Sequence, residues 1–227
     1  MDWQTLQQEI QSLPLNDQAA EYHTHAKEQL KHNLGLAKHL AEKAIELSRR
    51  TKNQSILADA YDIRGLIFQE KYDYTNAMQS FVDALRIRSK LKDETGIATS
   101  KNNIGLVFYL QEDYVQAEAN LTEALELKRK QGDIFAAAAI FKNLGDLYVA
   151  KEIYGTALNH YQHSLDIYLA EENYDAATTE GINLGLGFIT NSATSQAVKQ
   201  SKKVGMITNK TEENINKGIL GAVSSSW

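Results

Sequence analysis

Apolar residues recur at helical spacing along most of the chain, in paired stretches separated by short polar segments. The first clear pair consists of Ile63, Leu66 and Ile67, followed by Ala77, Phe81, Ala84 and Leu85. Spacings of three and four residues place these side chains on one face of a helix. The polar segment 69–73 between them suits a tight turn, and no sustained alternation of β-branched and polar residues predicts a strand. The pattern therefore predicts helical hairpins in an all-α chain.

The hairpins recur with a period of forty residues. The register is marked by Gly65, Gly105, Gly145 and Gly185, by Tyr74, Tyr114 and Tyr154, and by Ala77, Ala117, Ala157 and Ala197. A fixed period of this length is typical of a solenoid, in which each unit packs on its neighbours. We expect the glycines of each first helix to let the alanines of the second helix approach closely, because glycine otherwise weakens a helix.

The repeated unit resembles the tetratricopeptide repeat, which carries an aromatic residue, Leu-Gly, a second aromatic residue and later Ala-x3-Phe. The second unit reads Tyr61-x2-Arg64-Gly65-x2-Phe68 with Ala77-x3-Phe81, and the fourth reads Phe141-x2-Leu144-Gly145-x2-Tyr148 with Ala157-x3-Tyr161. The period is forty instead of thirty-four residues, and the usual proline after the second helix is absent. Such longer units look like those of kinesin light chains, spindle-orientation adaptors and bacterial signalling proteins. The resemblance implies an all-α, right-handed α-α superhelical solenoid of about five helix-turn-helix hairpins.

The register divides the chain into five predicted hairpins and two end pieces. The hairpins are 18–50, 58–91, 98–131, 138–171 and 178–207, within a solenoid over 17–207. Residues 1–16 are predicted to form an N-terminal capping helix that ends near Pro14, because proline breaks a helix interior. Residues 208–227 are predicted to be a C-terminal tail or a short capping helix.

Composition and charge narrow the classes of partner. The chain has no cysteine, which excludes a disulfide framework and a thiolate metal site. The longest apolar run, 134–141, is too short to span a bilayer. A net charge of −5 argues against binding to nucleic acid or to an anionic membrane surface. The N-terminal residues lack a secretory signal pattern, so we expect a cytoplasmic protein whose partner is another protein or a peptide.

Candidate chemistry is sparse, and we expect neither an enzyme nor a cofactor. His160 and His163 share a helix face, and Asp166 gives at best a three-ligand surface cluster, so no metal site is expected. The chain has no Gly-rich phosphate loop, zinc-protease helix motif or nucleophile elbow.

Three asparagines occupy one register of the predicted first helices: Asn103, Asn143 and Asn183. Asparagine is a poor helix-interior residue, because its amide competes for backbone hydrogen bonds. The carboxamide offers a donor and an acceptor that match the backbone of an extended peptide. The family resemblance implies an asparagine ladder of the kind found in kinesin light chains and spindle adaptors. In the alternative, each amide bonds to a neighbouring helix and only organises the solenoid.

The resemblance implies that the first helices line a concave groove, so residues around this register are expected to face it and to select partner side chains. They are Asp59, Asp62, Leu66, Asn102, Leu106, Tyr109, Lys142, Asp146, Ile182 and Leu186. The acids of the earlier unit and Lys142 of a later one predict a groove with a polarity. The family's carboxylate clamp is not supported, because leucine or aspartate stands at the position where the clamp has asparagine.

The leading hypothesis is a non-catalytic protein–protein interaction module that binds a peptide or an extended partner segment in the groove. Two alternatives stay open. The chain is the sensory or regulatory portion of a larger bacterial signalling protein, such as a histidine kinase, a nucleotidyl cyclase or a transcription regulator, or it is a self-associating scaffold.

Overall fold

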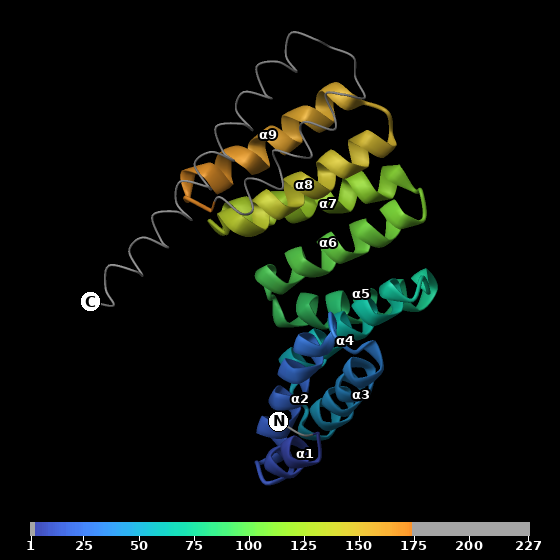
Figure 1. Ribbon diagram of the computed structural model, residues 1–227, viewed down its shortest axis with the longest axis vertical. Helices are drawn as coiled ribbons and strands as arrows, with labels where there is room; N and C mark the ends of the chain where they lie inside the picture. Colours follow the sequence, from blue (N-terminus) through green and yellow to red (C-terminus); the bar gives the residue numbers. More distant parts are fainter. Residues whose placement is uncertain (1–2, 174–227) are drawn as a thin grey trace, which may run out of the picture. The chain divides into compact units, whose positions relative to one another are not determined.

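The computed structural model describes residues 3–173, and that part of the chain consists of α-helices without strands (Figure 1). The helices are α1 (Trp3–Gln11), α2 (Leu15–Gln29), α3 (Leu34–Thr51), α4 (Gln54–Glu70), α5 (Tyr74–Leu91), α6 (Glu94–Leu110), α7 (Tyr114–Lys130), α8 (Ile134–Ala150) and α9 (Tyr154–Ala170). The predicted all-α repeat fold is confirmed. The predicted fifth hairpin, 178–207, and the segment 208–227 lie outside the described residues.

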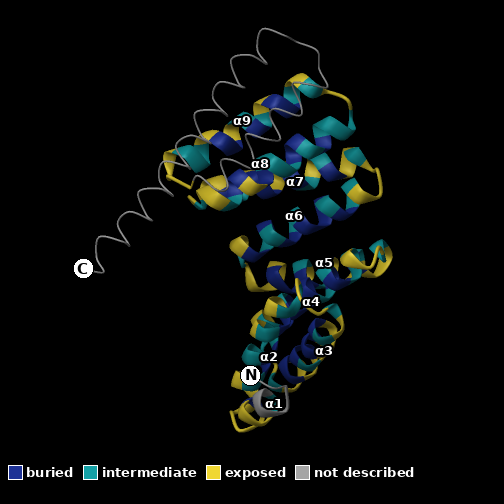
Figure 2. Ribbon diagram, in the orientation of Figure 1, coloured by how far each residue is buried: buried dark blue, intermediate teal, exposed yellow. Residues whose placement is uncertain are grey.

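The chain divides into two compact units, and the boundary falls within α7. Unit 1 is Met1–Ala124, and unit 2 is Leu125–Trp227. In unit 1 each helix from α2 to α5 packs against the next one along the chain, and α2 also contacts α4. In unit 2, α8 packs against α9. Buried residues follow the faces on which neighbouring helices meet within each unit, and exposed residues gather at the turns (Figure 2).

After α3, a turn of two or three residues recurs every twenty residues and joins one helix to the next. Its last residue but one adopts a left-handed backbone conformation, with φ between 55° and 71°, at Lys52, Tyr72, Lys92, Glu112, Gly132, Glu152 and Glu172. The next residue donates its backbone N–H to a carbonyl five residues earlier, as Asp93 does to Arg88 at 3.0 Å. This hydrogen bond closes a Schellman motif at the helix C-terminus.

The last residue of the turn also caps the helix that follows. Side-chain oxygens of Asn53, Asp73, Asp93, Asp113 and Asp133 accept a hydrogen bond from the backbone N–H three residues later. Because these caps begin the helices, α4, α6 and α8 start at 54, 94 and 134. The predicted units, drawn from apolar spacing, started four residues later, at 58, 98 and 138.

The repeated glycines make room for a large side chain of the second helix. A Cβ atom at Gly65 would lie 2.5 Å from the Phe81 ring, and one at Gly145 would lie 2.4 Å from the Tyr161 ring. At Gly105 the nearest atom would be Leu121 Cγ, at 2.9 Å. The sequence predicted that alanines of the second helix approach these glycines, and at Gly105 the backbone oxygen of Ala117 does lie 3.3 Å from such a Cβ. In all three hairpins the nearest atom belongs to the residue four positions after the alanine, because the space left by the glycine is filled by a longer side chain.

None of the helices within residues 3–173 is long and apolar enough to cross a membrane.

The α9 N-terminus provides a test of the capping turn. Ile153 occupies the cap position with φ −98° and ψ 66°, close to the −81° and 76° of Asp133, but it has no side-chain cap and is 45 % exposed. Ile153→Asp should raise the free energy of unfolding by about 1 kcal/mol, because it supplies the missing acceptor. Urea unfolding followed by circular dichroism measures the change. Asp113→Ala, which removes the cap of α7, should lower the same quantity by a similar amount, and an unchanged or less stable Ile153→Asp variant would contradict the cap assignment.

The glycine contact predicts opposite effects at two positions. Gly65→Ala should destabilise the chain by about 1–3 kcal/mol, since the added methyl group overlaps the buried Phe81 ring. Gly155→Ala, in α9, meets nothing within 4 Å and should be neutral or stabilising by up to about 1 kcal/mol. Thermal unfolding of both variants beside wild type measures the contrast. Equal melting temperatures would show that the Phe81 ring moves aside without cost.

Candidate functional site

The residues predicted to line a groove lie on the first helices of the hairpins, in two separate units. Unit 1 contains Asp59, Asp62 and Leu66 on α4 and Asn102, Asn103, Leu106 and Tyr109 on α6. Unit 2 contains Lys142, Asn143 and Asp146 on α8. Asn183, Ile182 and Leu186 lie outside the described residues. Asn103 and Asn143 therefore belong to different units.

A guanidinium group from a second helix occupies the predicted site in unit 1. Arg88, near the end of α5, donates from Nη1 to Asp62 Oδ2 at 2.5 Å and from Nη2 to Asp59 Oδ1 at 2.6 Å. Nη1 also donates to Ser100 Oγ at 2.8 Å and to the carbonyl oxygen of Gly96 at 3.2 Å. The Arg88 side chain is only 6 % exposed. Charge-assisted hydrogen bonds thus tie α5 to both α4 and α6.

Arg88 reaches α6 because Gly96 has no side chain. A Cβ atom at Gly96 would lie 2.4 Å from Arg88 Cδ. The neighbouring repeat units have other residues at these two positions. In place of Gly96 they have Ile56 and Ala136, and in place of Arg88 they have Ser48 and Lys128. Lys128 makes a local ion pair instead, between its Nζ and Asp133 Oδ2 at 3.0 Å. The network around Arg88 is therefore a departure from the repeat at the junction of α4, α5 and α6.

The network holds more negative than positive charge. Asp93 Oδ2 lies 3.9 Å from Arg88 Nε, so three carboxylates surround one guanidinium. Burial raises the pKa of Asp62 from 3.8 to about 6, although the charge and the hydrogen bond of Arg88 act to lower it. The charge of Asp59 raises the pKa of Asp62 further, and the side-chain amide of Asn103 lowers it. Desolvation is therefore the main influence on this carboxyl group.

Asn103 is a buried neighbour of this network, with 8 % of its surface exposed. Its Oδ1 accepts a hydrogen bond from Asn102 Nδ2 at 3.4 Å, and its amide acts on the Asp62 carboxyl group of the neighbouring helix. These surroundings favour the alternative in which the amide organises helix packing. Asn102, Leu106 and Tyr109 lie at i, i+4 and i+7 of α6 and are half-buried, so they share one helix face.

In unit 2 two predicted groove residues bind each other. Lys142 Nζ donates to Asp146 Oδ2 at 2.5 Å. Tyr161 OH, from α9, donates to Asp146 Oδ1 at 2.7 Å. The Tyr161 ring passes over Gly145, which gives it space to reach the carboxylate. Asp146 is thus held by donors from both helices of its hairpin.

The histidines of α9 contact aromatic rings of α8. His160 stacks on Tyr148 with ring centroids 5.2 Å apart, and His163 lies 5.1 Å from Phe141. Among the described residues, no group of three or more histidine, aspartate or glutamate side chains could hold a metal ion.

The sequence analysis missed Arg88 and considered Tyr161 only as part of the repeat motif. Both side chains reach the predicted groove residues from the second helix of a hairpin, whereas the prediction considered only residues of the first helices. The available signal for Arg88 was Gly96, a glycine outside the forty-residue register.

Comparison with known proteins gives the same architecture. Residues 94–170 match the tetratricopeptide repeat family model. A signal transduction ATPase with numerous domains from Pyrococcus horikoshii, which carries a tetratricopeptide repeat sensor, aligns with 91 % of this chain and 32 % of its own, at 18 % identity and a TM-score of 0.77. A Rap protein complexed with Competence and Sporulation Factor aligns with 91 % of this chain and 58 % of its own, at 18 % identity and a TM-score of 0.74.

Tetratricopeptide-like repeats of a putative kinesin light chain from Podosopora anserina align with 88 % of this chain and 99 % of their own, at 12 % identity and a TM-score of 0.71. No curated protein matches the chain in sequence. The chain spans only about a third of the signal transduction ATPase and over half of the Rap protein. The resemblance to tetratricopeptide repeats is confirmed, and this repeat is generally a non-catalytic interaction fold.

Burial of Asp62 gives a test by titration. Its carboxyl group should titrate near pH 6 in the folded chain, measured by carbon-13 NMR of the side chain. Arg88→Met should raise this midpoint, and Asp59→Asn should lower it, because each removes one of the named charges. Asp133 serves as an internal reference, since the hydrogen bond from Lys128 holds the pKa of Asp133 below 3.8. An Asp62 midpoint near 4 would contradict the dominance of burial.

The same shift has a consequence for stability. The folded-state pKa of Asp62 lies above its ordinary value, so the folded chain binds more protons than the unfolded chain between about pH 4 and 6. The free energy of unfolding of wild type, relative to Asp62→Asn, should therefore rise as the pH falls through this range.

Proposed function

We propose that this chain is a non-catalytic interaction module that binds an extended segment of a partner protein along the first helices of its hairpins. The observation that carries the proposal is the shared face of α6, where Asn102, Leu106 and Tyr109 lie half-buried. On α4, Leu66 stands at the position equivalent to Leu106 and is also half-buried. Amide, aliphatic and aromatic groups in one row suit an extended segment, which needs both hydrogen bonds and apolar contacts.

A rigid support strengthens this proposal. Arg88 ties α4, α5 and α6 together through four hydrogen bonds to Asp59, Asp62, Ser100 and Gly96. A binding face on helices that are already fixed relative to one another loses little conformational entropy when a partner binds. The Rap protein of similar fold, seen in complex with Competence and Sporulation Factor, supports an interaction role for such a chain.

The sensory portion of a larger signalling protein is the second candidate. The observation that favours it is the similarity to a signal transduction ATPase whose tetratricopeptide repeats form a sensor. In this proposal the same face binds a segment of a signal protein or of an effector domain. Reading the genomic frame on both sides of the 227 residues for an effector domain tests this candidate directly.

Binding along α6 predicts the loss of partner capture in a defined variant. The protein is immobilised and partners are recovered from lysate of its natural host, and the bound segment is then mapped and synthesised as a peptide. Asn102→Ala combined with Tyr109→Ala should weaken binding of this peptide at least tenfold, because both residues belong to the proposed face. Fluorescence anisotropy measures the dissociation constant.

The control carries one change in the turn between α6 and α7 and one in the first turn of α7. Glu112→Ala with Val115→Ala alters exposed residues outside the proposed face and should bind the peptide as wild type does. A separate triple variant, which combines Asn103→Ala, Asn143→Ala and Asn183→Ala, tests the asparagine ladder. Its helicity should equal that of wild type, so that a change in affinity reports on the three amides. Equal affinity of wild type and the Asn102/Tyr109 variant would refute the proposed face.

A further inference from the structure

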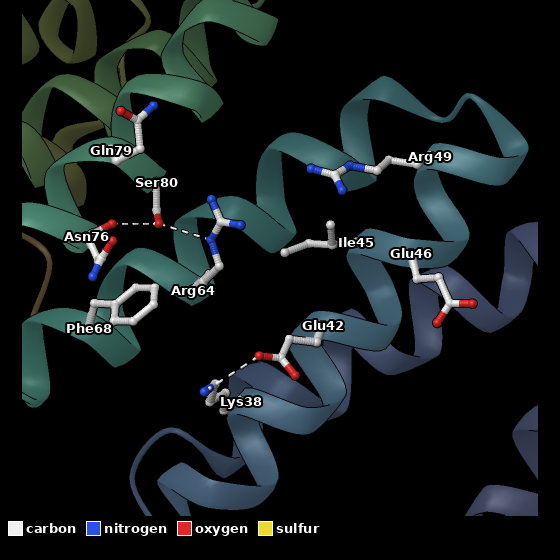
Figure 3. A pocket seen from close by; sticks show the side chains of 10 residues that line it. All are labelled: Lys38, Glu42, Ile45, Glu46, Arg49, Arg64, Phe68, Asn76, Gln79 and Ser80. Carbon is white, nitrogen blue, oxygen red and sulfur yellow. Dashed lines mark hydrogen bonds and ion pairs between the residues drawn. The ribbon is translucent and has the colours of Figure 1, made fainter.

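A second concave site lies on another side of unit 1, between α3, α4 and α5 (Figure 3). Its volume is about 670 Å³, within the range of about 300–1,000 Å³ that is usual for ligand pockets. Helix α4 contributes Arg64 and Phe68 to this pocket, whereas Asp62 and Leu66 face the Arg88 network and the proposed groove. A shift of two residues turns a helix by about 200°, so the two sites use opposite faces of α4.

Two arginines of the pocket are positioned by the same buried tyrosine. Arg49 Nη2, from α3, donates to Tyr61 OH at 2.6 Å. The guanidinium carbon of Arg64 lies 4.5 Å from the centroid of the Tyr61 ring, and Arg64 Nε donates to Ser80 Oγ at 3.0 Å. Tyr61 is only 6 % exposed, so it is a fixed anchor for both groups. Most of the rotational freedom of these two side chains is therefore lost before any ligand arrives.

Few carboxylates lie close enough to neutralise the positive charge of these two guanidinium groups. Within the described residues, Arg49 has no carboxylate within 4 Å, and Arg64 has Asp83 at 3.7 Å. Asp83 also accepts a shorter contact from Arg86, at 3.1 Å. Since each arginine carries five N–H donors, several donors of the pair stay available for an oxyanion.

The two glutamates of the pocket wall are neutralised along their own helix. Glu42 pairs with Lys38 at 3.7 Å, and Glu46 pairs with Lys43 at 3.1 Å. Both glutamate side chains are more than half exposed, so solvent screens their charge. An anion is therefore attracted to the end of the pocket that contains Arg49 and Arg64.

Apolar surface adjoins this charged end. Ile45 and Phe68 line the pocket beside Arg64, as Figure 3 shows. We infer that the pocket binds an acidic side chain of a partner protein, with its carboxylate held between Arg49 and Arg64 and an adjacent aliphatic side chain on Ile45 and Phe68. This surface is separate from the face proposed on α6, and it allows the chain to hold two partner segments at once.

The test uses a minimal peptide probe. The acetylated, amidated peptide Ala-Leu-Glu-Leu-Ala is titrated into nitrogen-15-labelled full-length chain, and amide shifts are followed by NMR. Shifts should cluster on residues of α3, α4 and α5 around the pocket, with a dissociation constant on the order of millimolar for so short a probe. The peptide with Gln in place of Glu should bind at least fivefold more weakly, and 0.5 M NaCl should weaken binding of the Glu peptide.

Matched variants decide whether the two arginines are responsible. Arg49→Gln and Arg64→Gln should each weaken binding of the Glu peptide at least fivefold. Arg129→Gln makes the same charge change at an exposed arginine of α7, outside the pocket, and should stay within twofold of wild type. The Asn102/Tyr109 variant should also bind the probe normally, which separates this site from the α6 face.

Any of four outcomes would overturn the inference. The first three are equal binding of the Glu and Gln peptides, loss of binding in Arg129→Gln as large as in Arg49→Gln, and shifts located outside α3, α4 and α5. Inorganic phosphate that competes with the peptide at equal concentration would also overturn it, because the pocket would then be a general anion site without preference for an acidic segment.

Discussion

The turn between consecutive helices is the constraint on which the rest of this structure depends. One residue in the left-handed conformation ends a helix, and the next residue closes that helix and caps the following one. Because the turn recurs every twenty residues, equivalent side chains return to equivalent faces in successive hairpins. The glycine that accommodates Phe81, Leu121 or Tyr161 then falls opposite its partner in each hairpin. Each cap contacts only its own helix, but the twenty-residue spacing of the turns is common to all described helices after α3.

The candidate sites arise where the chain departs from this repeat. Gly96 replaces a side chain that would collide with Arg88, and Arg88 then joins Asp59 and Asp62 to α6. Tyr61 combines a repeat role in the core with a second role as the anchor of Arg49 and Arg64. A repetitive scaffold supplies stability through many equivalent contacts, so single positions can change chemistry without loss of the fold. Specific recognition therefore has to be sought in the differences between units.

Much of the fold could be predicted from the sequence, because periodic packing leaves a periodic pattern. The forty-residue register of Gly65, Gly105 and Gly145 identified the hairpins and the tetratricopeptide resemblance. The starts of α4, α6 and α8 were placed four residues late, since an Asn or Asp cap begins a helix before its first buried side chain. The site was harder to predict, because Asp62 and Arg88 are twenty-six residues apart and meet only through a long side chain.

By itself, the sequence determined the helical class, the repeat and the absence of cysteine chemistry, since these follow from local propensity and spacing. Only the tertiary structure decided what the polar residues do. It buries Asn103 beside Asp62, pairs Lys142 with Asp146, and brings Arg49 and Arg64 to one tyrosine. The physical reason is that the charge state and availability of a polar side chain depend on desolvation and on partners from other helices. Neither has a signature in the spacing of residues along one helix.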